Sequence, residues 1–210
     1  MPKRSILSSV KDERLVEKRR NQIIQGAISL FKQKGFHRTT TREIATESGF
    51  SIGTLYEYIR TKEDVLFLVY EAINNHVHER LVQVIEAKDP SPKNLIGIID
   101  SYYRLMDEMQ DEVTILYQEV KSLKTDIKEQ VLEQERSKVQ MLKEAILNCL
   151  PEKATNIEAE LLANNIFVQG HMWGFRRWTL SKQYTIDEYI HMQLRFLFTM
   201  LKSEAEFEEA

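Results

Sequence analysis

Residues 38–64 read RTTTREIATESGFSIGTLYEYIRTKED and predict two short helices joined by a tight turn, with a third helix directly afterwards. Thr40 and Glu43 have the spacing of a capping box, which begins the first short helix. Gly49 can adopt the left-handed conformation that ends this helix, and Ser51 is a suitable N-cap for the next one. Two helices joined in this way form a helix-turn-helix, whose second helix enters the major groove of DNA.

The second short helix is expected over residues 52–58. Ile52, Leu55 and Ile59 recur at helical spacing and are expected to face the core. The side chains left to face outward are Thr54, Tyr56, Glu57 and Tyr58. Two outward tyrosines so close together have no evident core to serve, and this surface therefore favours nucleic acid as the partner.

Lys62 lies in the first turn of the next helix, which Thr61 and Asp64 are placed to cap. A lysine at a helix N-terminus is poorly matched to the helix dipole. The position makes sense if the N-terminus and Lys62 together hold a DNA phosphate. A helix-turn-helix outline alone is common in small helical domains, so the tyrosines and this lysine are what point to DNA.

The same stretch resembles the DNA-binding domain of the TetR family of bacterial repressors, and the match extends over residues 17–70. The matching positions are Ile24, Ala27, Leu30, Phe31, Gly35, Phe36, Thr41, Ile44, Ala45, Gly49, Ser51, Gly53, Thr54, Leu55, Tyr56, Tyr58, Lys62, Glu63 and Leu66. Ile59 departs from the family pattern, which usually has Phe there. Glu57 is a second departure: it either accepts from a cytosine amino group as a specificity element or points away from DNA.

The resemblance also implies a set of DNA contacts. Residues expected to touch DNA or lie beside it are Thr41, Arg42, Ser51, Gly53, Thr54, Tyr56, Tyr58 and Lys62. Among them, Tyr58 and Lys62 would mainly hold phosphates, whereas Thr54 and Tyr56 would lie nearer the bases.

The charge of the chain is unevenly distributed. Its formal net charge is −3, but residues 1–62 hold 13 Lys or Arg against 6 Asp or Glu, which gives +7. The remaining residues hold 16 basic and 26 acidic side chains, which gives −10. Nucleic acid is therefore expected to bind the basic N-terminal part, residues 1–62 (the head), and not the acidic remainder of the chain (the body). Residues 1–10 are expected to be a flexible tail. Its Lys3 and Arg4 either contact the minor groove or backbone of DNA or have no role in binding.

Composition restricts the class of protein further. Hydrophobic residues make up 42% of the 210 residues, enough for a substantial core, and only seven Gly and four Pro favour long helices. The single cysteine, Cys149, excludes an internal disulfide. Since neither a signal-peptide pattern nor an apolar run of membrane-spanning length is present, a cytoplasmic protein without a membrane partner is expected.

The expected fold is all-α, with an N-terminal three-helix domain over residues 1–62 and a six-helix body over residues 63–210. Besides the two short helices, helices are expected at about 12–34, 62–88, 92–105, 113–123, 126–150, 156–180 and 186–202. This total of nine is the number that the TetR resemblance implies. No linker separates the two parts, so movement of the fourth helix would displace the head. The acidic tail 203–210 is expected to fray.

The last two helices carry apolar stripes, formed by Leu161, Leu162, Ile166, Phe167, Ile186, Tyr189, Ile190, Leu194, Leu197 and Leu201. Such stripes serve a core or pair with a second copy around a two-fold axis. The family resemblance favours a homodimer built there as a four-helix bundle. Two heads could then read a palindromic operator in double-stranded DNA.

A sensor pocket is expected in the body, because aromatic and methionine side chains suit apolar ligands as well as a plain core. The segments 116–120 and 170–178 resemble TetR-type regulators of fatty-acid and sterol catabolism, which implies a fatty acyl-CoA as effector. The candidate ligand-binding residues are Tyr102, Tyr103, Met106, Tyr117, Phe167, His171, Trp173, Phe175, Arg176, Arg177 and Trp178. Gly170 and Gly174 leave one helix face bare for an acyl tail or a neighbouring helix. The two arginines would pair with coenzyme phosphates, with a partner such as Glu119, or with solvent.

Two other classes of protein compete with this interpretation. An enzyme is disfavoured because His76 and His78 do not share a helix face as a metal pair would, and no phosphate-binding loop or nucleophile elbow is present. No metal site and no cofactor are expected. The second alternative is a helical ligand-binding or protein-interaction module with no specific operator. The intact set of Gly53, Thr54, Tyr56, Tyr58 and Lys62 favours a ligand-responsive repressor instead.

Overall fold

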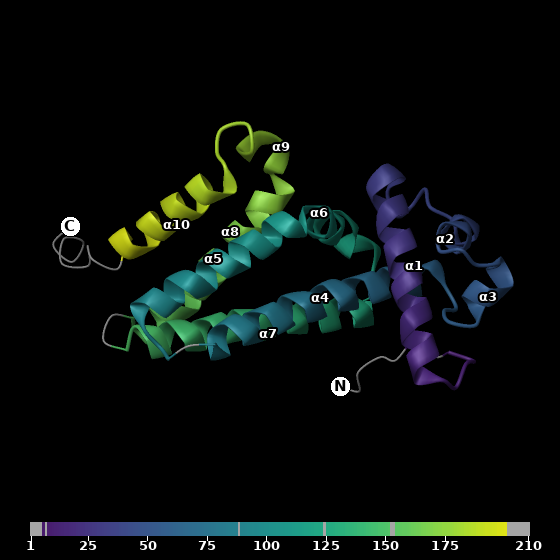
Figure 1. The fold of residues 1–210 in the computed structure, drawn as a ribbon, viewed down its shortest axis with the longest axis horizontal. Coiled ribbons are helices and arrows are strands. Elements are labelled where there is room, and N and C mark those ends of the chain that lie inside the picture. The colour runs from purple at the N-terminus through teal and green to yellow at the C-terminus, as the bar shows by residue number, and fades with distance from the viewer. Residues whose placement is uncertain (1–5, 7, 88, 124, 152–153, 201–210) are drawn as a thin grey trace. The chain divides into compact units, whose positions relative to one another are not determined.

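Helices are the only regular secondary structure in the described part of the chain (Figure 1). The computed structural model describes all residues except 1–5, 7, 88, 124, 152–153 and 201–210. The absence of strands among the described residues confirms the all-α fold class. Lys3, Arg4 and the tail 203–210, for which the sequence made predictions, lie outside the described residues.

Ten α-helices and one short 3₁₀-helix make up the described chain. Their bounds are α1 Glu13–Lys34, α2 Thr41–Glu47, α3 Ile52–Tyr56, α4 Lys62–Glu86, α5 Pro92–Glu108, α6 Gln110–Glu119, the 3₁₀-helix Val120–Ser122, α7 Thr125–Cys149, α8 Asn156–Phe175, α9 Arg177–Leu180 and α10 Ile186–Met200. Most bounds agree with the expected ranges to within two or three residues, because capping residues mark them in the sequence. For α5, Ser91 is the N-cap and Pro92 the first helical residue, as predicted.

The chain divides into two compact units. The first unit comprises residues 1–75 and 114–134, and the second unit comprises residues 76–113 and 135–210. Helices α4, α6 and α7 therefore each contribute residues to both units. The expected functional boundary after residue 62 stays a prediction.

Helix α1 supplies the central face of the first unit. Its buried residues are Ile23, Ile24, Gly26, Ala27, Leu30 and Phe31. Helix α2 approaches so closely that a Cβ built on Gly26 would lie 2.7 Å from Oγ of Ser48, and only glycine permits this approach. Ile44 of α2 and Leu55 of α3 are fully buried, as their spacing predicts. This small core fixes α2 and α3 beside α1 (Figure 1).

Helices α5, α8 and α10 pack together in the second unit, where α5 contacts both of the others. A Cβ on Gly170 of α8 would lie 2.5 Å from Cε1 of Tyr102, and one on Gly174 would lie 3.1 Å from Cγ1 of Val113. The sequence left open whether this bare face admits an acyl tail or a neighbouring helix. Side chains of α5 and α6 occupy it.

Helix α8 ends earlier than predicted. Its capping box, Thr155 with Glu158, is present as expected. However, Arg176 leaves the helical conformation, with φ −104° and ψ 17°, so the expected helix through Leu180 becomes α8 and the one-turn α9. The Arg176 N–H still bonds to the Met172 carbonyl at 2.8 Å as in a helix, and no Pro stands at the break.

The apolar residues of α8 and α10 divide between core and surface. Most described members of the expected stripes are buried, including Leu162, Ile166, Phe167, Tyr189 and Ile190, and they form core. Leu161 is 60% exposed. The other exposed large apolar side chains of α8 and α10 are Ile157, Val168, Phe175, Met192 and Phe196. Of the two roles that the sequence left open for these stripes, the buried members take the first and form part of the core.

Two further findings concern the helices and the cysteine. No helix among the described residues has the length and apolar character to cross a membrane. Cys149, at the end of α7, is a free and buried thiol that is 5% exposed.

Candidate nucleic-acid interface

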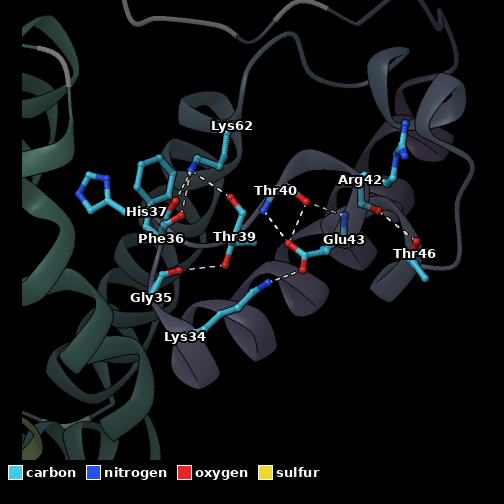
Figure 2. Close-up of polar contacts among 10 residues, drawn as sticks. All are labelled: Lys34, Gly35, Phe36, His37, Thr39, Thr40, Arg42, Glu43, Thr46 and Lys62. Atoms are coloured by element: carbon cyan, nitrogen blue, oxygen red, sulfur yellow. Dashed lines mark hydrogen bonds and ion pairs between the residues drawn. The ribbon is translucent and has the colours of Figure 1, made fainter.

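The first helix of the helix-turn-helix begins as predicted. The Thr40 N–H donates to Oε2 of Glu43 at 2.9 Å, and the Glu43 N–H donates to Oγ1 of Thr40 at 3.3 Å (Figure 2). Lys34 of α1 donates to the second oxygen of the same carboxylate. These bonds, first that from Lys34 and then those from Thr40, lower the pKa of Glu43 to about 2. The sequence predicted the capping box but not the Lys34 partner.

The turn and the second helix follow from two local signals. Gly49 has φ +76°, the left-handed conformation that ends α2. Ser51 is the N-cap of α3 and accepts from the Thr54 N–H at 3.1 Å. Helix α3 is shorter than expected and ends at Tyr56.

Residues on α2 and α3 present an outward polar surface. Tyr56 is 50% exposed, and its hydroxyl lies 3.3 Å from Oγ1 of Thr41 at the start of α2. Arg42, Ser51 and Gly53 are exposed, and Thr41 and Thr54 are half-buried. Six of the eight expected DNA-contacting residues are therefore at least partly exposed on α2, α3 and the turn between them.

Tyr58 does not belong to this outward surface. Its side chain is 3% exposed and stacks on the Phe50 ring, with 6.5 Å between the ring centroids. Because α3 ends at Tyr56, residues 57 and 58 lie in a turn, and this turn exposes Glu57 and buries Tyr58. The expectation that Tyr58 faces outward is wrong.

Lys62 is bound within the first unit. Its Nζ donates to the carbonyl oxygens of Phe36 at 2.9 Å and Thr39 at 3.0 Å, and more weakly to that of His37 at 3.4 Å. The same ammonium lies 4.3 Å from the centroid of the Phe36 ring (Figure 2). An ammonium has three N–H donors, and each has an acceptor here, so a phosphate would have to replace one of these bonds. Hydrogen bonds to these loop carbonyls thus compensate for the unfavourable position of a lysine at the N-terminus of α4.

The described part of the expected flexible tail is anchored. Ile6 is buried, and the Ser9 N–H donates to the Glu57 carbonyl at 2.9 Å. Arg20 of α1 donates through Nη2 to the carbonyls of both Ile6 and Tyr58. Backbone carbonyls left free at the end of α3 therefore hold part of this segment, and the expected flexibility of residues 1–10 stays a prediction. Sequence spacing gave no signal for Arg20.

The expected ligand-binding residues fall into two groups in the structure. Six of them are buried in the second unit, namely Tyr102, Tyr103, Met106, Phe167, His171 and Trp173. Among these, the Tyr102 hydroxyl donates to the Phe167 carbonyl at 3.0 Å, and the Phe167 and His171 rings meet edge to face at 4.4 Å. Exposed members of the set are Phe175, Arg176 and Trp178, and Tyr117 is an exposed residue of the first unit.

Arg177 has a partner that the sequence did not identify. Its Nη1 donates to Oδ1 of Asp107 at 2.9 Å, and Nε1 of Trp173 donates to the same oxygen at 2.8 Å. These three residues line a cavity of about 380 Å³ in the second unit, together with Glu188 and residues 181–186. The exposed guanidinium of Arg176 remains accessible to solvent.

Buried ionisable groups lie close to this aromatic core. The pKa of His171 is lowered to about 4, first by loss of hydration and then by the charge of Lys138. Burial also lowers the pKa of Lys138 to about 8 and raises that of Glu135, each opposed by the attraction between the two. Within the described residues, no group of three or more His, Cys, Asp or Glu side chains could hold a metal ion.

Comparison with known proteins agrees with the geometry of the first unit. Residues 23–69 match the model of the family described as bacterial regulatory proteins, tetR family. The HTH-type transcriptional regulator HbdR of Aromatoleum sp. (strain CIB) is 28% identical over 194 residues, which cover 92% of this chain and 85% of that protein.

Solved structures share the fold. The transcriptional regulator FadR from Bacillus subtilis, in complex with stearoyl-CoA, superposes with a TM-score of 0.70 at 20% identity, covering 84% of this chain and 96% of that one. AibR, in complex with isovaleryl coenzyme A and operator DNA, gives a TM-score of 0.69 at 19% identity with the same coverage of both chains. With the helix-turn-helix described above, these matches show that residues 23–69 form a DNA-binding domain of the tetR family and that the chain is similar to a regulator with such a domain over most of its length.

Proposed function

We propose that the protein is a dimeric transcriptional repressor that binds a palindromic operator and is released from it by a small apolar effector. The observation that carries this proposal is the outward surface of the helix-turn-helix, centred on the Tyr56 hydroxyl and Thr41 Oγ1 at 3.3 Å. Helix α3 would enter the major groove, with Thr54 and Tyr56 nearest the bases. Thr41, Arg42, Ser51 and Gly53 would lie along the phosphates, and Lys62 would reach a phosphate only by giving up a loop carbonyl.

A second copy of the chain is the proposed partner of the exposed apolar face on α8 and α10. Ile157 is 82% exposed, Leu161 60% and Phe196 55%, and monomeric proteins rarely expose so many large apolar side chains together. A two-fold dimer would cover them with their own copies. It would also present two α3 helices, which a palindrome requires.

The proposed effector is a fatty acyl-CoA, and relatives support this choice. Two regulators of the same fold have been crystallised with stearoyl-CoA and with isovaleryl coenzyme A. In this chain, Tyr102, Phe167 and His171 form the apolar core of the second unit, and Arg176 offers an exposed cation for phosphate. The protein would act in the cytoplasm and by binding rather than by catalysis.

Selection of bound duplexes from a randomised library tests the proposal. The full chain should enrich a palindrome, and log K should fall linearly with log salt concentration. Arg42→Ala should reduce the magnitude of this slope by about one, because one phosphate contact is lost. Arg176→Ala, an exposed arginine of the second unit, is the matched control and should leave the slope unchanged.

Failure to enrich any sequence, even at low salt, would favour the alternative of a helical interaction module with no specific operator. Mass spectrometry of the purified protein tests the effector independently. A co-purified acyl compound would support the proposal, and loss of DNA binding on adding stearoyl-CoA would support release. A duplex affinity that stays constant across short- and long-chain acyl-CoA probes would contradict the effector.

A further inference from the structure

The loop between α1 and α2 is held by side chains from two later helices. Residues 35–39 connect the end of α1 to Thr40, the N-cap of α2. Lys62 of α4 binds the carbonyl oxygens of this loop, as described above. A different helix holds the amide side, because the Phe36 N–H donates to Oε1 of Glu119 at 3.2 Å. Glu119 is the last residue of α6 and belongs to the first unit.

Glu119 is a buried acid that is 8% exposed. A carboxylate in such a place needs hydrogen bonds to offset its lost hydration. Besides the Phe36 N–H, the Ser122 hydroxyl donates to Oε2 of Glu119 at 3.2 Å, and Oγ of Ser122 lies 3.0 Å from Nε2 of His37. Since the one Ser122 proton is directed to the carboxylate, the Ser122 oxygen accepts from Nε2–H of His37. Glu119 therefore holds the Phe36 backbone directly and the His37 side chain through Ser122, and Nε2 of His37 lies 4.0 Å from Oε2 of Glu119.

We propose that Glu119 is a positioning residue for DNA binding, which fixes the loop 35–39 and thereby the start of α2. Thr40, Thr41 and Arg42 follow this loop directly, so a loose loop leaves the DNA-facing end of α2 correctly placed for only part of the time. The apparent dissociation constant then rises in inverse proportion to that fraction. No spacing rule in the sequence links positions 36 and 119.

This inference rests on the proposed function, because it assigns the placement of the DNA-facing end of α2 to one carboxylate of the first unit.

Affinity of the full-length variants for the duplex that the wild-type protein selects tests the inference. Glu119→Ala removes the acceptor, and the dissociation constant should rise about tenfold or more, the equivalent of one lost charge-assisted hydrogen bond. Glu119→Gln should bind as tightly as wild type, because an amide oxygen accepts the same N–H. Gln118→Ala is the matched control, since Gln118 is the exposed neighbour on α6.

Hydrogen exchange at the Phe36 amide, followed by NMR, separates positioning from general stability. Exchange should become faster in Glu119→Ala but stay slow in Glu119→Gln and Gln118→Ala. Should Glu119→Ala fail to fold, Glu119→Asp serves in its place: it keeps the charge, but its oxygen is one methylene too short for Phe36, so affinity should fall here too. Wild-type affinity in a folded variant whose Phe36 amide exchanges fast would overturn the inference. Absence of any selected duplex for wild type would instead refute the proposed function.

Discussion

Single side chains in this protein often do a different task from the one their sequence position suggests. Lys62 lies at a helix N-terminus, where the sequence predicts a phosphate contact, yet its ammonium bridges the carbonyls of Phe36 and Thr39. The loop carbonyls come from residues more than twenty positions away, so no local pattern could reveal them. Tyr58 shows the same limit, because its burial depends on α3 ending at Tyr56.

Replacing Lys62 by Met should lower the free energy of unfolding by about 1–3 kcal/mol, because the loop carbonyls lose their donor. Urea denaturation followed by circular dichroism measures this difference. Lys18→Met is the matched control, since Lys18 is an exposed lysine on α1, and its stability should stay close to wild type. Equal stability of the two variants would show that the bridging bonds contribute nothing to folding.

His171 should make the stability of the protein depend on pH. Its pKa is lowered to about 4 in the folded chain, whereas an unfolded histidine has a pKa of about 6.5. Between these values the unfolded chain binds a proton that the folded chain does not, so stability falls as pH falls from about 6.5 to about 4. The free energy of unfolding of the wild-type protein should therefore fall by roughly 1–2 kcal/mol between pH 7 and pH 5.

His171→Gln removes the titrating group and should flatten this part of the stability curve. Denaturation at pH 7 and pH 5 gives the comparison for both proteins. The neighbouring Tyr102 and Phe167 rings provide the burial, and Lys138 provides the like charge. An unchanged difference between the two pH values in His171→Gln would assign the acid sensitivity to other groups.

At the scale of elements, sequence signals predicted where helices begin better than where they end. Capping residues Thr40, Ser51, Ser91 and Thr155 each begin a helix as expected. Helix ends depend more on tertiary packing: α8 stops at Phe175 although Arg176 is an ordinary helix former. The helix-turn-helix was predictable because its signals are local, whereas the anchors Arg20 and Glu119 act over long sequence separations.

Close contact between α5 and α8 depends on a missing side chain at Gly170. Gly170→Ala would place a Cβ 2.5 Å from Cε1 of Tyr102 and should destabilise the protein by about 1–3 kcal/mol. The matched control is Gly97→Ala on α5, where a Cβ meets nothing within 4 Å. That variant should be more stable than wild type by about 0.5–1 kcal/mol, because alanine is the better helix former. Thermal or urea denaturation of both variants checks the opposite signs.

At the scale of the whole molecule, a dimer is required for two heads to read a palindrome. The double variant Leu161→Asp with Phe196→Asp places two charges on the exposed face of α8 and α10 and should shift the protein to monomer. Sedimentation velocity measures the change, and operator affinity should fall with it. Ile96→Asp, at a 39% exposed position of α5, is the control and should stay dimeric. A dimer that survives the double substitution would place the interface elsewhere.

The solitary thiol makes this chain convenient for spectroscopy. Because Cys149 is 5% exposed in the folded protein, it should react slowly with maleimide reagents. A cysteine introduced at an exposed position such as Thr46 of α2 could then carry a fluorophore or spin label without prior removal of the native one. Two such labels, one in each copy of a dimer, would report the separation of the two reading heads directly, with and without an added effector.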